Sequence, residues 1–272
     1  MMQKSDSYKL PEGNVLISLS GGRTSAYMLH QILVANDGLR DDVVVAFANT
    51  GREMQGTIEF VKEIQHRWNV NIRWLEYRKA KPKFEEVNHN SVSFDGKPFM
   101  EMIDSTSSNK FLPNQNMRYC TQELKVKTIK RFLVYSGWER WTNTVGIRAD
   151  EPKRIKQSND NRWINWYPIA TAKETVRNVN EFWKQQPFDL KIMKGSGNCD
   201  GCFLKSEATL SAMIREYPER MQWWSNMEEL TGGSFHKNRT YKSLVRFVNN
   251  QRDWIFDNEA YLCQADDGEC TG

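Results

Sequence analysis

Residues 15–25 read Val15-Leu16-Ile17-Ser18-Leu19-Ser20-Gly21-Gly22-Arg23-Thr24-Ser25, an apolar strand that runs directly into Ser-Gly-Gly and then into a helix. Two glycines allow a tight turn and a close approach of the backbone to a ligand. The start of the helix presents unpaired N–H groups and the positive end of its dipole, and the nearby hydroxyls can add further hydrogen bonds. This combination predicts a binding site for an anion, most often phosphate. The alternative is an ordinary strand–helix turn, because short glycine motifs also occur without a ligand.

Short apolar segments alternate with helical patterns along the first two thirds of the chain. Strands are predicted at about 15–19, 43–48, 72–75 and 142–147, and helices at about 25–35, 55–68, 122–135 and 173–186. This alternation predicts an α/β fold with a parallel sheet flanked by helices, which is Rossmann-like. Residues 91–117 are rich in Asn, Ser, Gly and Pro and are predicted to form a long loop or lid.

The chain changes character after about residue 187. We therefore predict a nucleotide-binding α/β domain over 14–190 and a mostly helical, cysteine-containing extension over 191–272 that ends in a mobile tail. The glycine turn and Asn49-Thr50-Gly51 both follow predicted strand ends. Ligands of parallel sheets bind at the carboxyl ends of strands, so both segments are expected to face one crevice.

Bulk composition excludes some classes of protein. The 272 residues are 39% hydrophobic and 26% charged, with a net charge of +4, which is ordinary for a globular protein and compatible with an anionic ligand. No run of apolar residues is long enough to span a membrane, and the first thirteen residues lack the apolar core of a secretion signal. Five cysteines, an odd number, favour reduced thiols in a cytoplasmic protein that serve metal or redox chemistry.

Five segments, in order, resemble one protein family. The glycine turn resembles the PP-loop of the adenine-nucleotide α-hydrolases, in particular the branch of phosphoadenylyl-sulfate (PAPS) and adenylyl-sulfate (APS) reductases. The other matching segments are Phe47–Glu53, Arg118–Val126, Gly146–Arg154 and Cys199–Cys202. The resemblance spans roughly residues 14 to 230 and implies a PP-loop fold of the ATP pyrophosphatase (HUP) type that binds ATP, APS or PAPS.

Cys199 and Cys202 have the spacing at which two thiolates reach one metal or cluster. Cys120 precedes a basic helix, and we expect positive charge and the helix N-terminus to lower the pKa of its thiol. The resemblance implies a [4Fe–4S] cluster on these three cysteines, with Thr121 standing where the family has a further cysteine. A fourth ligand would be Cys263, Cys270, an exogenous sulfur species or water. The alternative is zinc on the four cysteines other than Cys120, because thiolates suit both metals.

The resemblance also gives Cys270 a candidate catalytic role. Glu269-Cys270 resembles the start of the C-terminal Glu-Cys-Gly motif, whose cysteine attacks the sulfate sulfur in the reductases, although Thr271 stands where the family has glycine. Thioredoxin or glutathione would then be the reductant. The alternative is a solvent-exposed tail thiol.

Nucleotide-binding candidates cluster at three strand ends. They are Ser20, Gly21, Gly22, Arg23, Thr24 and Ser25, then Asn49, Thr50 and Gly51, and then Gly146, Arg148 and Arg154. Arginine binds sulfate or phosphate through two parallel hydrogen bonds, although Asp150 and Glu151 could neutralise this cluster instead. ATP-cleaving relatives carry aspartate where this chain has Thr24. A hydroxyl is a poorer Mg²⁺ ligand than a carboxylate, so Mg²⁺ is only a further candidate.

The leading hypothesis is a PAPS-reductase-family enzyme that reduces or transfers sulfur from (phospho)adenylyl sulfate. A second hypothesis is ATP-dependent adenylation of an acceptor, such as a nucleic-acid base, for sulfur insertion, with nucleic acid as the weaker candidate partner. A third is a nucleotide-binding protein with structural zinc and no turnover.

Overall fold

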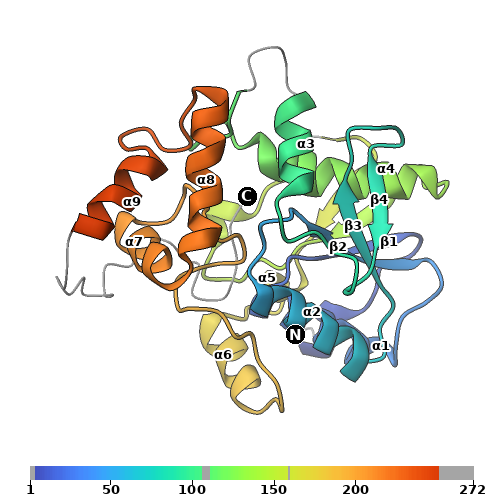
Figure 1. The fold of residues 1–272 in the computed structure, drawn as a ribbon. Coiled ribbons are helices and arrows are strands. Elements are labelled where there is room, and N and C mark those ends of the chain that lie inside the picture. Colours follow the sequence, from blue (N-terminus) through green and yellow to red (C-terminus); the bar gives the residue numbers. More distant parts are fainter. Residues whose placement is uncertain (1–3, 106–110, 159, 251–272) are drawn as a thin grey trace.

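A computed structural model describes residues 4–105, 111–158 and 160–250. Its centre is a six-stranded sheet in the order β4-β3-β2-β1-β5-β6, in which only β4 is antiparallel to its neighbour (Figure 1). The strands are β1 (Val15–Leu19), β2 (Val43–Asn49), β3 (Ile72–Tyr77), β4 (Phe84–Val87), β5 (Trp141–Thr144) and β6 (Trp163–Trp166). The α/β fold with a mostly parallel sheet flanked by helices is thereby confirmed.

Helices cover both faces of the sheet and continue to the end of the described chain. They are α1 (Arg23–Asn36), α2 (Gln55–Arg67), α3 (Lys97–Ser105), α4 (Lys127–Tyr135), α5 (Pro168–Thr171), α6 (Val176–Lys184), α7 (Glu207–Glu216), α8 (Pro218–Thr231) and α9 (Tyr241–Asn250). Shorter helical segments are η1 (Lys4–Tyr8), η2 (Thr121–Val126) and η3 (Pro152–Arg154). None of the helices within the described ranges is long and apolar enough to cross a bilayer.

The central strand β1 is buried on both faces, which explains its nearly continuous apolar sequence. Val15 and Ile17 pack into one core with residues of α1, α2 and α6, and Leu16 packs into a second core with residues of α4. Ser18 lies on the same face as Leu16, because side chains alternate along a strand. This face therefore becomes polar only toward the carboxyl end of β1.

The strand order identifies the position beside β1 as a candidate ligand crevice. The chain runs from β1 outward through β2 and β3, and later returns to β5 on the other side of β1. The strand order thus reverses between β1 and β5, and crevices at such points are where open α/β sheets bind ligands.

The C-terminal helices form a separate core that still shares residues with the sheet domain. Helices α7, α8 and α9 lie together on one side of the molecule (Figure 1), around the fully buried Trp224. Met54 and Phe99 belong to the same cluster. The division into 14–190 and 191–272 remains a prediction, since one hydrophobic core contains residues from both parts.

Segment 91–117, predicted as a long loop, contains the nine-residue helix α3. Phe99, Met102 and Ile103 are buried at helical spacing. The surrounding Asn, Ser and Gly residues hid this short periodic pattern. The tail, with Cys263 and Cys270, lies outside the described residues.

Lowering the pH is expected to destabilise the fold through His30 of α1. Its ring lies 5.0 Å from that of Trp68 and 4.8 Å from that of Phe182, and burial lowers its pKa. Because the unfolded chain then binds a proton more readily, stability falls as pH drops through the unfolded value of about 6.5. Denaturant unfolding at about pH 7.5 and about pH 5.5 should show a smaller loss for His30→Phe than for the wild type. A loss of equal size in both proteins would contradict this assignment. His66→Gln, at an exposed position of α2, is the control for removing a histidine.

Candidate functional site

The phosphate-loop candidate, residues 20–25, is a compact turn that joins β1 to α1. Its bend depends on Gly21, whose φ of +84° is in the region that favours glycine. A hydroxyl network holds the turn from inside: Ser25 Oγ lies 2.8 Å from Ser20 Oγ and donates to the carbonyl of Gly22 over 3.0 Å. The α1 N-terminus has no side-chain cap. The turn therefore leads into a helix end whose N–H groups are suited to an anion.

A second strand end packs against this turn at very short range. A Cβ atom on Gly146, just after β5, would lie 3.1 Å from the Cα of Ser25. Glycine at this position therefore lets the β5 end approach the start of α1.

A cavity of about 330 Å³ lies on the α4 face of the sheet at this point. Its polar lining comes chiefly from Ser18, Ser20, Ser25, Gln122, Lys125, Lys130, Asn143 and Arg154. Its apolar lining includes Leu16, Ala48, Val126, Ile129, Trp141 and Trp163. One cavity thus combines hydroxyls of the glycine turn, cationic groups and a flat aromatic wall.

The cationic groups at the cavity are held by acidic partners. Lys125 of η2 forms an ion pair of 3.0 Å with the fully buried carboxylate of Glu53, and Arg154 pairs with Glu151. A π-helical turn such as η2 is often found at functional sites. Lys125 had not been singled out as a site residue, although it lies in the segment that resembles the reductases.

Arg148 and Thr24 form a buried, hydrogen-bonded pair. Arg148 Nη1 donates to Thr24 Oγ1 over 3.2 Å, and its Nε donates to Asp150 over 3.1 Å. Arg148 is 4% exposed and Thr24 is fully buried. The structure thus ties the β5 end to the glycine turn through a guanidinium group.

Arg23 points to a different part of the surface. Its guanidinium pairs with Asp189, with an Nε–Oδ1 distance of 2.7 Å, and it lines a separate cavity beside α6. The structure thus brings Ser20, Ser25, Gly146 and Arg154 to the cavity and directs Arg23 elsewhere.

Asn49, Thr50 and Gly51 are buried beneath α3 and serve the local structure. Asn49 donates to Glu76 over 2.6 Å, and Thr50 donates to Glu53 over 3.1 Å. A Cβ on Gly51 would lie 2.7 Å from the Cδ of Pro98. Their neighbour Ala48, at the end of β2, does line the cavity.

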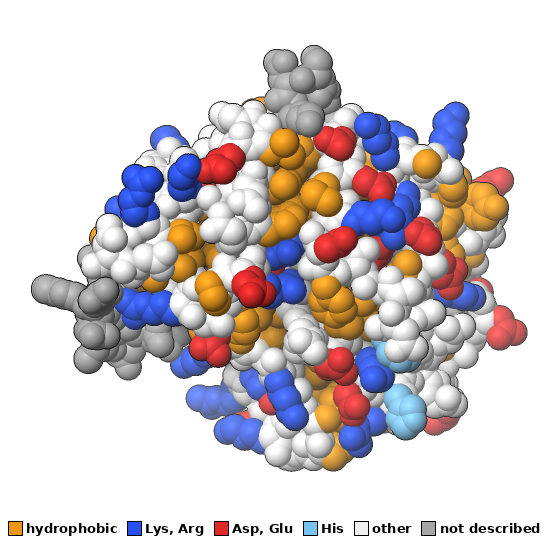
Figure 2. Space-filling model, in the orientation of Figure 1, with side chains coloured by type: hydrophobic (Ala, Val, Ile, Leu, Met, Phe, Trp, Pro, Cys, Tyr) orange, Lys and Arg blue, Asp and Glu red, His pale blue; other side chains and the backbone are white. Residues whose placement is uncertain are grey.

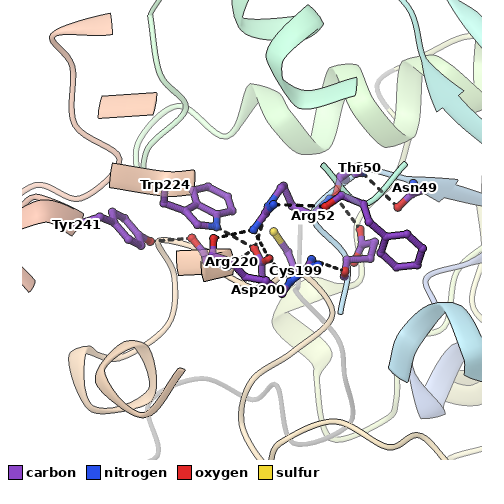
Figure 3. Close-up of polar contacts among 12 residues, drawn as sticks. Asn49, Thr50, Arg52, Cys199, Asp200, Arg220, Trp224 and Tyr241 are labelled. Carbon is purple, nitrogen blue, oxygen red and sulfur yellow. Dashed lines mark hydrogen bonds and ion pairs between the residues drawn. The ribbon is translucent and has the colours of Figure 1, made fainter. Parts of the chain in front are cut away.

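The turn Cys199-Asp200-Gly201-Cys202 is organised by the buried carboxylate of Asp200 (Figure 3). Asp200 accepts from Arg52 Nη2 at 2.5 Å, Arg220 Nε at 2.7 Å and Trp224 Nε1 at 2.8 Å. Asp200 is fully buried and Arg52 is 3% exposed. Burial lowers the pKa of Arg52, and the neighbouring Asp200 carboxylate opposes that shift.

Gly201, the third residue of the turn, packs directly against the indole ring of Trp224. Its Cβ position would lie 2.1 Å from Trp224 Nε1, so only glycine fits. Its carbonyl accepts from the hydroxyl of Tyr241 over 2.7 Å. Burial raises the pKa of Tyr241 well above its usual value, so this hydroxyl remains a donor.

The cysteine turn is also bonded to the glycine turn. Asn198 Nδ2 donates to the carbonyl of Ser20 over 2.7 Å, and Cys199 forms a β-bridge with Glu53. Asn198 is 1% exposed. A buried hydrogen bond thus holds the residue before Cys199 against the nucleotide-loop candidate.

The three described cysteines do not form a metal-binding group. Cys120, Cys199 and Cys202 are not joined by disulfides. Among residues 4–105, 111–158 and 160–250, no three His, Cys, Asp or Glu side chains converge to hold a metal ion. Cys120 and Cys199 border the same hydrophobic cluster. The ligand set that the resemblance implies also includes Cys263, which lies outside the described residues, so this set remains a prediction.

The expectation of a low thiol pKa at Cys120 was wrong. Burial raises its pKa, and the opposing effects of Thr121, Lys125 and Arg118 are smaller. Charges next to a residue in sequence are visible without a structure, whereas removal of the thiol from water depends on tertiary packing.

Comparison with known proteins gives a family, a relative in a phage and distant structural neighbours. The family described as "Phosphoadenosine phosphosulfate reductase domain" matches residues 14–186. The uncharacterized nin region protein ORF290 of Escherichia phage lambda is 31% identical over 211 residues, which are 74% of this chain and 69% of that protein. An uncharacterized protein of Methanocaldococcus jannaschii is 22% identical over 82% of this chain and 43% of its own length.

Two solved structures are similar at low identity. The PAPS reductase from Candida auris, in its phosphate complex, has a TM-score of 0.45 at 13% identity and covers 68% of this chain and 79% of its own. The U34-tRNA thiolase NcsA from Methanococcus maripaludis, with its [4Fe–4S] cluster, has a TM-score of 0.44 at 14% identity. The match covers 99% of this chain and 85% of the thiolase chain.

Proposed function

This chain belongs to the phosphoadenosine phosphosulfate reductase family, and on that premise we propose that it binds an adenine nucleotide between β1 and β5. The observation that carries the proposal is the cavity of about 330 Å³ that joins Ser20 and Ser25 of the glycine turn to Lys125 and Arg154. The phosphates would lie at residues 20–25, where the α1 N-terminus and the cationic side chains favour negative charge.

The proposed reaction is reduction or transfer of sulfur from (phospho)adenylyl sulfate. The Cys270 thiolate would attack the sulfur, the bond from that sulfur to the phosphate oxygen would break, and the nucleotide would leave with that electron pair. The resulting thiosulfonate would release sulfite when thioredoxin or glutathione supplies two electrons and is oxidised to a disulfide. Lys125 and Arg154 would stabilise the charge on the departing phosphate.

Cys270→Ser tests this route directly. We expect the variant to release no sulfite in single turnover with PAPS or APS, while its affinity for the nucleotide stays within about twofold, since the binding cavity is untouched. Gln264→Asn, a change in the same C-terminal segment at a residue with no proposed role, is the control. Sulfite release by Cys270→Ser at the wild-type rate would exclude the covalent route.

ATP-dependent adenylation of an acceptor for sulfur insertion is the alternative on the same fold. It predicts tight binding of ATP, weak binding of APS and PAPS, and pyrophosphate release. Basic and acidic side chains are interspersed on the face in Figure 2, which does not favour nucleic acid there. The third candidate, a nucleotide-binding protein with zinc, predicts binding without turnover.

The proposed metal is a [4Fe–4S] cluster on Cys120, Cys199 and Cys202, with Cys263 as fourth ligand, and zinc is the rival. Either would need the described thiols to rearrange or to join ligands outside the described residues. Iron, sulfide and zinc analysis after anaerobic purification separates the two. A cluster requires iron and sulfide in equal amounts.

A further inference from the structure

Two polar side chains that line the cavity and a third on the neighbouring strand β6 form a hydrogen-bonded chain across three strands. Ser18 of β1 donates to Asn143 Oδ1 of β5 over 3.0 Å. Asn143 Nδ2 donates to Asn165 Oδ1 of β6 over 3.1 Å, and Asn165 Nδ2 donates to the backbone carbonyl of Lys156 over 3.0 Å. Asn143 and Asn165 are register partners, so the sheet itself positions them.

The last acceptor sets the direction of every bond in this chain. A backbone carbonyl only accepts, so the amide nitrogen of Asn165 must face Lys156 and its oxygen must face Asn143. That oxygen requires the nitrogen of Asn143, which turns the oxygen of Asn143 toward Ser18. The Ser18 hydroxyl must then donate. Toward the cavity, Ser18 is consequently an acceptor, while Asn143 keeps a second N–H as a donor.

This acceptor–donor pair lies where a nucleobase would reach. Ser18 and Asn143 line the cavity, with Val126 and Ile129 also in the lining. Ser20 of the glycine turn lies beyond Ser18 at the carboxyl edge, and Trp141 lies two residues before Asn143 on the same face. A nucleotide held by its phosphates at the turn therefore extends its base over this pair, an argument that rests on the proposed function.

We propose that Ser18 and Asn143 read the six-membered edge of the base and select adenine, with Asn165 as the residue that positions them. Adenine offers a 6-amino donor beside a ring-nitrogen acceptor, which complements the acceptor of Ser18 and the donor of Asn143. Hypoxanthine reverses both, because its 6-oxygen accepts and its N1–H donates. Since the phosphates fix the other end of the nucleotide, the base cannot shift freely to restore the pairing.

Calorimetric titration of the full chain with ATP, ITP and inorganic tripolyphosphate tests the proposal. The wild type should bind ATP at least about 10-fold more tightly than ITP, the discrimination expected of a two-bond contact. Asn165→Val removes the acceptor that orients the side-chain amide of Asn143, and Asn165 itself does not contact the ligand. It should reduce the ratio of ATP affinity to ITP affinity to about twofold or less. Its affinity for tripolyphosphate should not change, a separation that a general loss of structure would not produce.

Ile164→Thr is the matched control, because this residue of β6 is 70% exposed and faces the opposite side of the strand. It should keep the wild-type ratio. Ser18→Ala removes the acceptor directly and should lower the ratio even if Asn165→Val fails to fold. Equal wild-type affinities for ATP and ITP would overturn the proposal that Ser18 and Asn143 select adenine, and so would an unchanged ATP/ITP ratio in Ser18→Ala. Neither result would contradict the proposed nucleotide binding itself. Failure of the wild type to bind any of the nucleotides or tripolyphosphate would overturn the proposed function.

Discussion

Asp200→Asn should lower the free energy of unfolding by about 3–5 kcal/mol, the usual cost of leaving a buried charge without its partner. Asp200 is fully buried, and the side chain of its partner Arg52 is 4% exposed. Asparagine keeps the shape but carries no charge, and its amide hydrogens would face the guanidinium hydrogens of Arg52 and Arg220. The Cys199–Cys202 turn should loosen, since Asp200 also accepts from the backbone N–H of Gly201 over 2.7 Å.

Denaturant unfolding monitored by tryptophan fluorescence measures this loss, because Trp224 donates directly to Asp200. Asp42→Asn is the matched control: its ion pair with Arg40 has side chains 43% and 37% exposed. We expect it to cost only about 0.2–1 kcal/mol. If both variants lost the same small amount, the buried network could not be what holds the cysteine turn.

Gly21→Ala should abolish nucleotide binding and destabilise the fold. The added Cβ would lie 2.6 Å from Thr57 Cγ2 and 3.0 Å from Phe47 Cε2, both in the packed core below the loop. The φ of +84° adds about 1–2 kcal/mol of strain for any residue with a side chain. The loop can relieve these contacts only by moving, which would displace the hydroxyls of Ser20 and Ser25 from the cavity.

Gly137→Ala separates strain from crowding. Gly137 has nearly the same φ, +88°, but its added Cβ would meet nothing within 4 Å. This control should lose only the strain of about 1–2 kcal/mol and bind ATP normally. Thermal unfolding and ATP titration of both variants give the comparison. Normal ATP affinity in Gly21→Ala would show that phosphate binding does not depend on the shape of this turn.

Local patterns predicted the elements that form the nucleotide-loop candidate. Strand β1 was predicted with its observed bounds, because five apolar or small residues end at a glycine turn. Strand β6 was missed: it is a four-residue edge strand whose exposed Ile164 interrupts any apolar pattern. Asn165 of this strand therefore could not be identified as a hydrogen-bond partner of Asn143 at the cavity.

Long-range pairings explain most of what the sequence could not predict about the site. Arg52 and Asp200 are separated by 148 positions, and neither residue type signals burial on its own. The spacing of Cys199 and Cys202 indicated a metal pair, yet Asp200 between them carries the densest set of hydrogen bonds in that turn. Within the sequence, the aspartate and glycine between the two cysteines were the signal that this turn could be organised by hydrogen bonds.

The bond between Asn198 Nδ2 and the Ser20 carbonyl couples two regions that carry different chemistry. A displacement of residues 20–25, where we propose that the phosphates bind, would be transmitted through this bond to Asn198, the residue before Cys199. We therefore expect the rate at which a thiol reagent labels Cys199 to change when a nucleotide binds at residues 20–25.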